Sequence, residues 1–288
     1  MKVLENKIDF IVLVSVTNAN PNGDPLDGNR PRTTYTGHGE ISDVCIKRKL
    51  RNRLQDMGEN IFVQSDERCD DGFSSLSDRA GNTITSYTSK EDYAAQACMK
   101  WFDVRAFGQV FAYKNGKDKD KNKDGISVGV RGPVSVHQAI SISPVDISSM
   151  QITKSVNSET TADGKKSSDT MGAKHMVGFG LYEIKGSINV QLAEKTGFTE
   201  DDAEKIKECL RTLFINDCSS ARPDGSMEVI RLYWWKHNNK IGQYSSAKVH
   251  KSLEIKPKEG MTVPKSAEDY SVTLTALDGL EPEIIDGI

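Results

Sequence analysis

Seven cationic side chains are concentrated in one short stretch of this sequence, between residues 30 and 53. Only Glu40 and Asp43 are acidic in the same stretch, although the chain of 288 residues has a formal net charge of −3. Lysine and arginine side chains that are held together bind phosphate groups and release counterions, so such binding is sensitive to salt and does not depend on base sequence. The stretch therefore predicts a local phosphate-binding surface. Its seven cations are Arg30, Arg32, Lys47, Arg48, Lys49, Arg51 and Arg53.

A helix is expected to hold most of these cations in place. Ser42 suits its N-cap and Asp43 suits the positive end of its dipole. Lys47 and Arg51 border one side of an apolar stripe, and few acidic neighbours on the helix are available to pair with the cations. The alternative is an ordinary surface helix whose long basic stems cover a core. The stripe consists of Ile46, Leu50, Leu54 and Met57.

The elements before this helix are a buried strand and a long turn. The run Ile8–Val16 is short and rich in β-branched residues, which is typical of a strand buried on both faces. Asn18–Pro25 then has the composition of a turn. We expect the turn and the basic helix to form one groove.

The composition excludes several classes of protein. No run approaches the length of a membrane span, and Met1–Lys7 has too little apolar sequence for a signal peptide. Five scattered cysteines without a CxxC motif indicate neither a disulfide framework nor a zinc site, so we expect a cytoplasmic protein. Residues 252–288 hold eight acidic and three basic residues. The net charge of the whole chain therefore does not reveal a basic surface elsewhere.

Two polar stretches are predicted to be exposed insertions. The first is 64–90, which is rich in Ser, Asp and Gly and lacks apolar periodicity. The second, 114–125, has oxygen-bearing residues at the spacing of a calcium loop, but Arg131 stands where the twelfth-position glutamate is required. We therefore expect no metal at this loop.

A β-ribbon is predicted at about 145–180, because two extended segments flank an entirely polar middle. Met150, Met171 and Met176 would be exposed on such a ribbon, where soft side chains can wedge against bases. The alternative is an ordinary hairpin with its methionines on the core face. The run Gly178–Gly180 lacks the third glycine of a dinucleotide loop, so no cofactor is expected there.

The order of the elements predicts an α+β fold. A helix at Thr199–Phe214 and a strand at Met227–Lys236 complete a β-α-β-β-α-β pattern that begins with Ile8–Val16. This is the ferredoxin-like or RNA-recognition (RRM) layout, enlarged by insertions. Arg105 lies in an apolar segment, where it is expected to form a structural ion pair, with Asp103 as the candidate partner, or to contact a ligand.

Five ordered segments resemble the signature segments of a known family. They are VTNANPNGDP, GNRPR, GHGEISDVCIKRKLRN, WFDVRAFGQVFA and MGAKHMVGFGLY. Through them the chain, up to about Val249, is similar to the CRISPR-associated Cascade backbone subunit of subtype I-C. That subunit is a branch of the RAMP superfamily and akin to the I-B backbone subunit.

The resemblance implies a modified RRM-like palm over 1–250, with insertions at about 64–90 and 114–125 and a protruding thumb ribbon at about 145–180. The acidic segment 251–288 would pack on the palm or be partly mobile. Copies would assemble head-to-tail on CRISPR RNA and present its spacer for pairing with target DNA. The other partners would be the end-cap RAMP subunit and the large and small Cascade subunits, with no cofactor, metal or membrane.

The resemblance also implies which residues contact RNA. Met150, Met171 and Phe179 are the candidates to wedge a base on the thumb. The candidates for RNA binding are Asn20, Asn22, Arg30, Arg32, Lys47, Arg48, Lys49, Arg51, Arg105, Lys174 and His175.

Two other functions are compatible with the sequence. Related RAMP proteins cleave RNA with an aspartate in the loop that here holds Asp24 and Asp27. If one of these two aspartates has that role, the chain is an endoribonuclease. Both aspartates stand beside glycine or proline, so a role in the turn is the simpler explanation, and no catalytic residue is predicted. The second alternative is a single-strand binding module without defined assembly partners.

Overall fold

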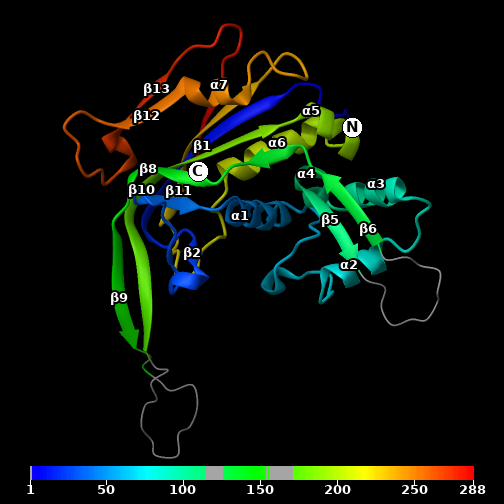
Figure 1. Cartoon of the computed structure of the whole chain (residues 1–288), viewed down its shortest axis with the longest axis horizontal. Helices are drawn as coiled ribbons and strands as arrows, with labels where there is room; N and C mark the ends of the chain where they lie inside the picture. Colours follow the sequence, from blue (N-terminus) through cyan, green and yellow to red (C-terminus); the bar gives the residue numbers. More distant parts are fainter. Residues whose placement is uncertain (1, 114–125, 154, 156–170) are drawn as a thin grey trace, which may run out of the picture.

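The computed structural model describes residues 2–113, 126–153, 155 and 171–288 (Figure 1). The predicted insertion 114–125 and the polar middle of the predicted ribbon, 157–170, lie outside the described residues. Among the described helices, none is both long and apolar enough to cross a membrane.

The strand β1 (Ile8–Ala19) is the centre of the main sheet. It pairs on one side with β10 (Met171–Ile188) and on the other with β11 (Met227–Lys236), and both pairings are antiparallel. The strand order is β14-β11-β1-β10-β8-β4, and β7 and β9 also pair with β10. The shorter strands are β4 (His38–Ile41), β7 (Val134–Val136), β8 (Ala139–Pro144), β9 (Ile147–Thr153) and β14 (Glu283–Asp286).

Both faces of this sheet are covered, which explains why β1 is almost continuously apolar. Phe10 and Val12 belong to the cluster that contains the helices α1 (Asp43–Asp56) and α6 (Glu200–Arg211). Ile11 and Leu13, which alternate with them, belong to a second cluster on the opposite face. The prediction of a strand buried on both faces is confirmed.

The predicted β-α-β-β-α-β pattern is realised by β1, α1, β8, β10, α6 and β11. Their strands lie in the order β11-β1-β10-β8, so the fourth, first, third and second strands of the pattern are neighbours. The protein therefore has a mixed α+β fold with one main antiparallel sheet.

Both helices begin with a side-chain cap, and for α1 it is Ser42, as the sequence predicts. The Oγ of Ser42 accepts a hydrogen bond from the Cys45 N–H at 3.2 Å, and α1 begins at the next residue. Thr199 and Asp202 form a reciprocal capping box at the start of α6. Each cap satisfies backbone donors that the first turn leaves without a partner.

Residues 60–113 and 126–131 form a separate small core beside the sheet. Phe62, Tyr93, Trp101 and Phe111 pack together there. The predicted exposed insertion 64–90 contributes a helix, α2, that its polar sequence did not predict. The elements of this part are η2 (Asp66–Arg68), α2 (Leu76–Thr83), α3 (Lys90–Lys100), α4 (Phe102–Phe107), β5 (Gly108–Tyr113) and β6 (Ile126–Arg131).

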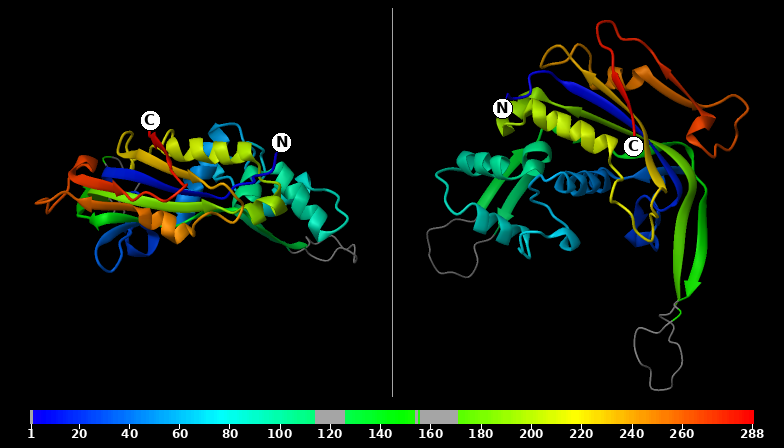
Figure 2. Two further views of the ribbon diagram at one scale, coloured as in Figure 1. Left: turned by 90° about the horizontal axis from the view of Figure 1, so that it is seen from above. Right: turned by 180° about the vertical axis from the view of Figure 1, so that it is seen from behind.

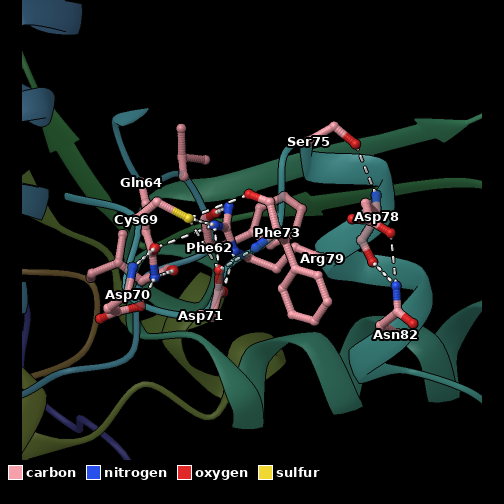
Figure 3. Close-up of polar contacts among 12 residues, drawn as sticks. Phe62, Gln64, Cys69, Asp70, Asp71, Phe73, Ser75, Asp78, Arg79 and Asn82 are labelled. Atoms are coloured by element: carbon pink, nitrogen blue, oxygen red, sulfur yellow. Dashed lines mark hydrogen bonds and ion pairs between the residues drawn. The ribbon is translucent and has the colours of Figure 1, made fainter. Parts of the chain in front are cut away.

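Arg79 of α2 organises the loop that precedes it (Figure 3). Its guanidinium is buried, and it donates to both carboxylate oxygens of Asp71, to the Phe62 carbonyl and to Gln64 Oε1. The hydrogen bond from Arg79 holds the pKa of Asp71 down at about 2. A polar loop can thus have a fixed shape because one arginine satisfies several of its acceptors.

The predicted ribbon is present as the pair β9 and β10, which extends away from the body of the molecule (Figures 1 and 2). Met171 pairs with Thr153 at its outer end and Val177 with Ile147 at its base. β10 continues from the ribbon into the main sheet, where it lies beside β1. Because one strand belongs to both, the ribbon is anchored in the most buried part of the fold.

The C-terminal segment packs on the main sheet. β14 pairs with β11 along the edge of the main sheet. Leu253, Tyr270 and Leu280 are buried in the cluster on the face opposite α1. The other elements of this region are α7 (Ser246–Ser252), β12 (Leu253–Pro257), η4 (Ala267–Asp269) and β13 (Tyr270–Leu274), and α5 (Val190–Thr196) precedes α6.

Arg105 forms a structural ion pair, but the candidate partner Asp103 was wrong. Its Nε and Nη2 donate to the two oxygens of Asp202 at 2.9 Å each, and its Nη1 donates to the Cys98 carbonyl. Asp103 instead accepts from the backbone N–H groups of Phe62 and Val63. Since all three nitrogens of Arg105 donate within the protein, we do not retain it as an RNA contact.

This ion pair should be needed for stability. Arg105→Met would leave the Asp202 carboxylate buried without its counter-charge, and the free energy of unfolding should fall by about 3–5 kcal/mol in urea denaturation. Arg211→Met removes an exposed pair with Glu208 on the same helix and should cost less than about 1 kcal/mol. Equal losses in the two variants would contradict the structural role.

Candidate nucleic-acid interface

The loop after β1 is stabilised by its own asparagines. Asn22 Oδ1 accepts from both the N–H and the Oγ of Ser42, at 2.9 and 2.8 Å, so it ties the loop to the N-cap of α1. Asn20 is 4% exposed and donates to the Asn29 carbonyl at 2.7 Å. The predicted RNA contacts Asn20 and Asn22 therefore use these side-chain groups to shape the loop, and we do not retain them as side-chain ligands of RNA.

The basic helix is only partly available for binding. Lys49 is 4% exposed and forms an ion pair with Asp217, and Arg51 Nε donates to Asp103 at 2.8 Å. Burial lowers the pKa of Lys49, against the opposing effect of Asp217. We therefore do not retain Lys49 and Arg51 as primary phosphate contacts, because both hold α1 against distant parts of the chain.

Lys47 and Arg48 are held more loosely. Lys47 pairs with Asp43 one turn earlier at 3.1 Å, an interaction that water screens at the surface. Arg48 Nη1 donates to the Val63 carbonyl at 2.6 Å, and within the described residues it has no carboxylate partner. Burial and the neighbouring Arg51 lower the pKa of Arg48, and the charge of Asp103 opposes this effect.

The loop and the ribbon meet at Ser149. Arg30 Nη1, from β3 (Arg30–Pro31), donates to Ser149 Oγ at 2.9 Å, and His175 Nδ1 lies 2.8 Å from the same oxygen. Two residues predicted from distant segments, Arg30 and His175, are thus brought together. The sequence alone could not place them side by side, because the ribbon residue that joins them was not among the candidates.

The two faces of the ribbon carry different side chains. The register pairs Lys174 with Met150 on one face and His175 with Ser149 on the other. Met150 is 49% exposed and Met171 is 59% exposed, as predicted. Since Met171 pairs with Thr153 on the face of His175, the two candidate wedges project to opposite sides.

Two further predictions for the ribbon were wrong. Met176 is buried, with 9% exposure, because it lies where the ribbon joins the body. Phe179 pairs with Thr17 of β1 within the main sheet and packs against the cluster on the face opposite α1. Phe179 is therefore not on the protruding part of the ribbon, where a wedge would be needed.

Two large exposed side chains on the same loop were missed. Leu26 in η1 (Pro25–Asp27) and Tyr35, after β3, are both almost fully exposed. The sequence offered one signal for Tyr35, which is that an aromatic residue stands within a turn. Such a ring is expected to be exposed, and exposed rings can stack on bases.

The loop aspartates are engaged within the turn. Asp24 Oδ1 accepts from the Leu26 N–H at 3.0 Å and lies 3.3 Å from Arg32 Nη2. Asp27 lies 3.8 Å from Arg30 Nε. Within the ranges that the structure describes, no group of histidine, cysteine and carboxylate side chains is placed to hold a metal ion.

The family of the chain follows from comparison with known proteins. The model of the family CRISPR-associated protein Cas7 matches residues 6–275. The chain belongs to the Cas7 family. The match spans β1, the basic helix, the ribbon and most of the C-terminal segment, so these elements belong to one family domain.

A relative and two solved structures add to this comparison. A CRISPR-associated protein Cas7 from Haloferax volcanii is 26% identical over 219 residues, which cover 72% of this chain and 64% of the relative. A chain of a CRISPR RNA-guided surveillance complex, pre-nicking, is 13% identical with a TM-score of 0.49, over 89% of this Cas7-family chain and 84% of that chain. A chain of a CRISPR RNA-guided surveillance complex is 16% identical with a TM-score of 0.47, over 89% and 78%.

The position of Lys49 predicts a contrast between neighbouring lysines of α1. Lys49→Met should lower the free energy of unfolding by about 2 kcal/mol, because among the described residues Asp217 then keeps Arg222 alone as a counter-charge. Lys47→Met should cost less than about 1 kcal/mol, since its pair with Asp43 is at the surface. Urea denaturation measures both. A Lys49 variant as stable as the wild type would contradict the structural assignment.

Proposed function

We propose that this chain is a backbone subunit of a type I-C CRISPR interference (Cascade) complex. It binds CRISPR RNA through the phosphates, without reading base sequence, and leaves the spacer able to pair with target DNA. The observation that carries the proposal is the contact of Arg30, Ser149 and His175. It joins the loop beside the basic helix to the base of the ribbon in a chain of the Cas7 family.

The side chains around this contact suit a backbone-binding role. Arg30, Arg32 and Lys174 offer positive charge at three points along the loop and ribbon, and His175 adds a titratable ring. Contacts with phosphates position a nucleic acid without reading it, which a protein that serves any spacer requires. Tyr35 offers an exposed ring on which a base could stack.

The ribbon supports a proposal for assembly. It extends from the body and exposes Met150 and Ile152 on one face and Met171 on the other. We propose that copies contact one another head-to-tail through it, since a heterologous contact that does not close builds a filament whose length the RNA sets. The end-cap, large and small Cascade subunits would complete the complex in the cytoplasm.

We propose that the subunit does not cleave RNA. Asp24 accepts from the Leu26 N–H and pairs with Arg32, so its carboxylate is already engaged in shaping the loop. The endoribonuclease alternative would require this carboxylate to bind a metal ion or to activate the attacking hydroxyl.

RNA binding tests the main proposal. Arg30→Gln with Lys174→Gln should weaken binding of single-stranded RNAs of unrelated sequence by the same factor. The slope of log affinity against log salt should become shallower by about 0.7 for each phosphate that the variant no longer neutralises. Fluorescence anisotropy over a salt series measures both quantities.

The matched control removes two positive charges elsewhere. Lys195→Gln with Arg231→Gln, on α5 and β11, should leave affinity and slope unchanged. A loss confined to one RNA sequence would contradict the phosphate mechanism. A wild-type chain that forms no discrete larger species on CRISPR RNA in size-exclusion chromatography would contradict assembly and favour the single-strand binding module.

Cleavage assays test the non-catalytic proposal. Labelled RNA incubated with the purified chain and Mg²⁺ should remain intact, both with the wild type and with Asp24→Ala. Cleavage by the wild type that Asp24→Ala abolishes would overturn the proposal and make the chain an endoribonuclease.

A further inference from the structure

One edge of the main sheet is closed by a strand that lies beyond the family match. The family model matches residues 6–275, and β14 begins at Glu283. β14 pairs antiparallel with β11, from Trp234 opposite Glu283 to Arg231 opposite Asp286. Within the described part of the chain it is the last strand of the sheet at this edge (Figure 2). Without β14, the edge would therefore be β11 itself.

β11 has the properties of a strand that pairs with other chains when its edge is open. It is ten residues long and contains the run Leu232–Trp235, whose aromatic members favour strands. An open edge presents a row of backbone N–H and C=O groups to which a second strand can bind, and a long apolar strand is the most prone to such pairing. Two copies of β11 can pair antiparallel with each other, because the same surface patch serves on both sides of a two-fold contact.

β14 replaces this long edge with a short, charged one. It has four residues, and Pro282 stands directly before it. Its first and last residues, Glu283 and Asp286, are both exposed. Short length, charge and proline are features by which edge strands avoid pairing with other chains. The outer side of β14 is therefore poorly suited to receive a further strand.

The opposite edge of the sheet is closed in another way. It is formed by β4, whose outer side is covered by the loop after β1. The Glu40 N–H donates to the Arg32 carbonyl at 2.9 Å, and Thr33 and Gly39 form a β-bridge. Of the two edges in the described part of the sheet, only the one at β11 depends on β14.

β14 adds little to the hydrophobic core. Ile285 is partly buried against the cluster that contains α1 and α6, whereas Ile284 is 51% exposed. The strand does, however, lie along the backbone of β11 over residues 231–234. Its main effect is therefore to cover backbone groups of β11 and not to bury apolar side chains.

Ion pairs hold both ends of β14. Asp286 Oδ1 lies 2.8 Å from Arg231 Nε, and Glu283 Oε2 lies 2.9 Å from Nζ of Lys207 on α6. The carboxylates of Asp286 and Glu283 are more than half exposed, so water screens both pairs. They orient the strand without fixing it strongly.

A close backbone approach follows directly after β14. A Cβ added at Gly287 would lie 1.8 Å from the Val229 carbonyl oxygen, so only glycine fits there in the observed position. The Gly287 N–H also points to the Ile230 carbonyl, at 3.4 Å. This position therefore offers a way to displace the strand by a single substitution.

We infer that β14 is a guard strand, which occupies the edge of β11 and thereby prevents antiparallel pairing between the β11 strands of two copies. The open edge would accept a second copy of this chain, because its β11 is equally long, apolar and self-complementary. The inference concerns the chain without RNA and does not rest on the proposed function. It adds to the proposed head-to-tail assembly a device that suppresses a competing side-to-side contact.

Gly287→Val in the full chain tests the inference. The added side chain has no room beside Val229, so β14 should leave β11, and copies should pair through the open edge. In analytical ultracentrifugation without RNA, the average mass should rise with concentration to about twice the wild-type value. The matched control is Gly129→Val on β6, where an added Cβ meets no atom within 4 Å. It should sediment as the wild type does.

Hydrogen exchange shows whether the association uses β11. In the Gly287→Val chain, the amides of residues 231–234 should exchange faster than in the wild type at low protein concentration and regain protection at high concentration. An excess of a synthetic peptide with the wild-type sequence of residues 281–288 should return the mass to the wild-type value. The same peptide carrying Gly287→Val should not.

A second variant changes charge alone. Glu283→Lys with Asp286→Arg places like charges opposite the two cations that hold β14, and it should have the same effects more weakly, because the pairs are exposed. The control Glu254→Lys with Asp278→Arg makes the same charge change on exposed carboxylates outside β14. It should leave both the mass and the exchange of β11 unchanged.

Three results would overturn the inference. The first is a wild-type mass in both variants while residues 231–234 lose protection, because an open edge that does not pair needs no guard. The second is association without renewed protection of residues 231–234, since it would use another surface. The third is β14 that stays paired in both variants. Association through β11 that the peptide reverses, in the variants and in neither control, supports the inference.

Discussion

The burial of β1 on both faces is the constraint on which the rest of the structure depends. Phe10, Val12 and Val14 lie in the cluster that contains α1 and α6, and Ile11 and Leu13 lie in the cluster that contains α7, β12 and β13. A strand with two apolar faces must be covered twice, which requires the C-terminal segment as well as the helices. β1 also leads directly into the loop that is tied to the N-cap of α1, and it pairs with the strand that extends into the ribbon. The candidate interface is therefore attached to a strand that is buried on both faces.

Ion pairs between distant segments then divide the basic residues into two groups. Lys49, Arg51 and Arg105 connect α1 and α4 to Asp217, Asp103 and Asp202, and they stabilise the packing of the elements. Arg30 and Arg48 donate to uncharged acceptors, Ser149 and the Val63 carbonyl, and we propose that such cations bind RNA. A cluster that is uniform in sequence thus serves two purposes, because a desolvated cation needs a close counter-charge and an exposed one does not.

The sequence predicted the elements better than the contacts between them. Capping residues gave the starts of α1 and α6, and the apolar pattern gave the bounds of β11, because these signals are local. The end of α6 was placed too late, at Phe214 instead of Arg211. Local signals could not show that Asp217 faces Lys49 or that Asp202, not Asp103, faces Arg105, since those partners meet only after the chain has folded. The helix α2 was missed for the same reason: Arg79 stabilises a polar stretch through acceptors on the preceding loop. Ser149 and Arg222 were likewise visible only from the structure.

Hydrogen exchange of the chain with and without single-stranded RNA tests the central claim most directly, because it shows where the RNA lies without any substitution. The account predicts slower exchange of backbone amides in the loop 20–32 and in β9. It predicts no change in α7, β12 or β13, which cover the opposite face of the sheet. Protection confined to that opposite face, with the loop and ribbon unchanged, would contradict it.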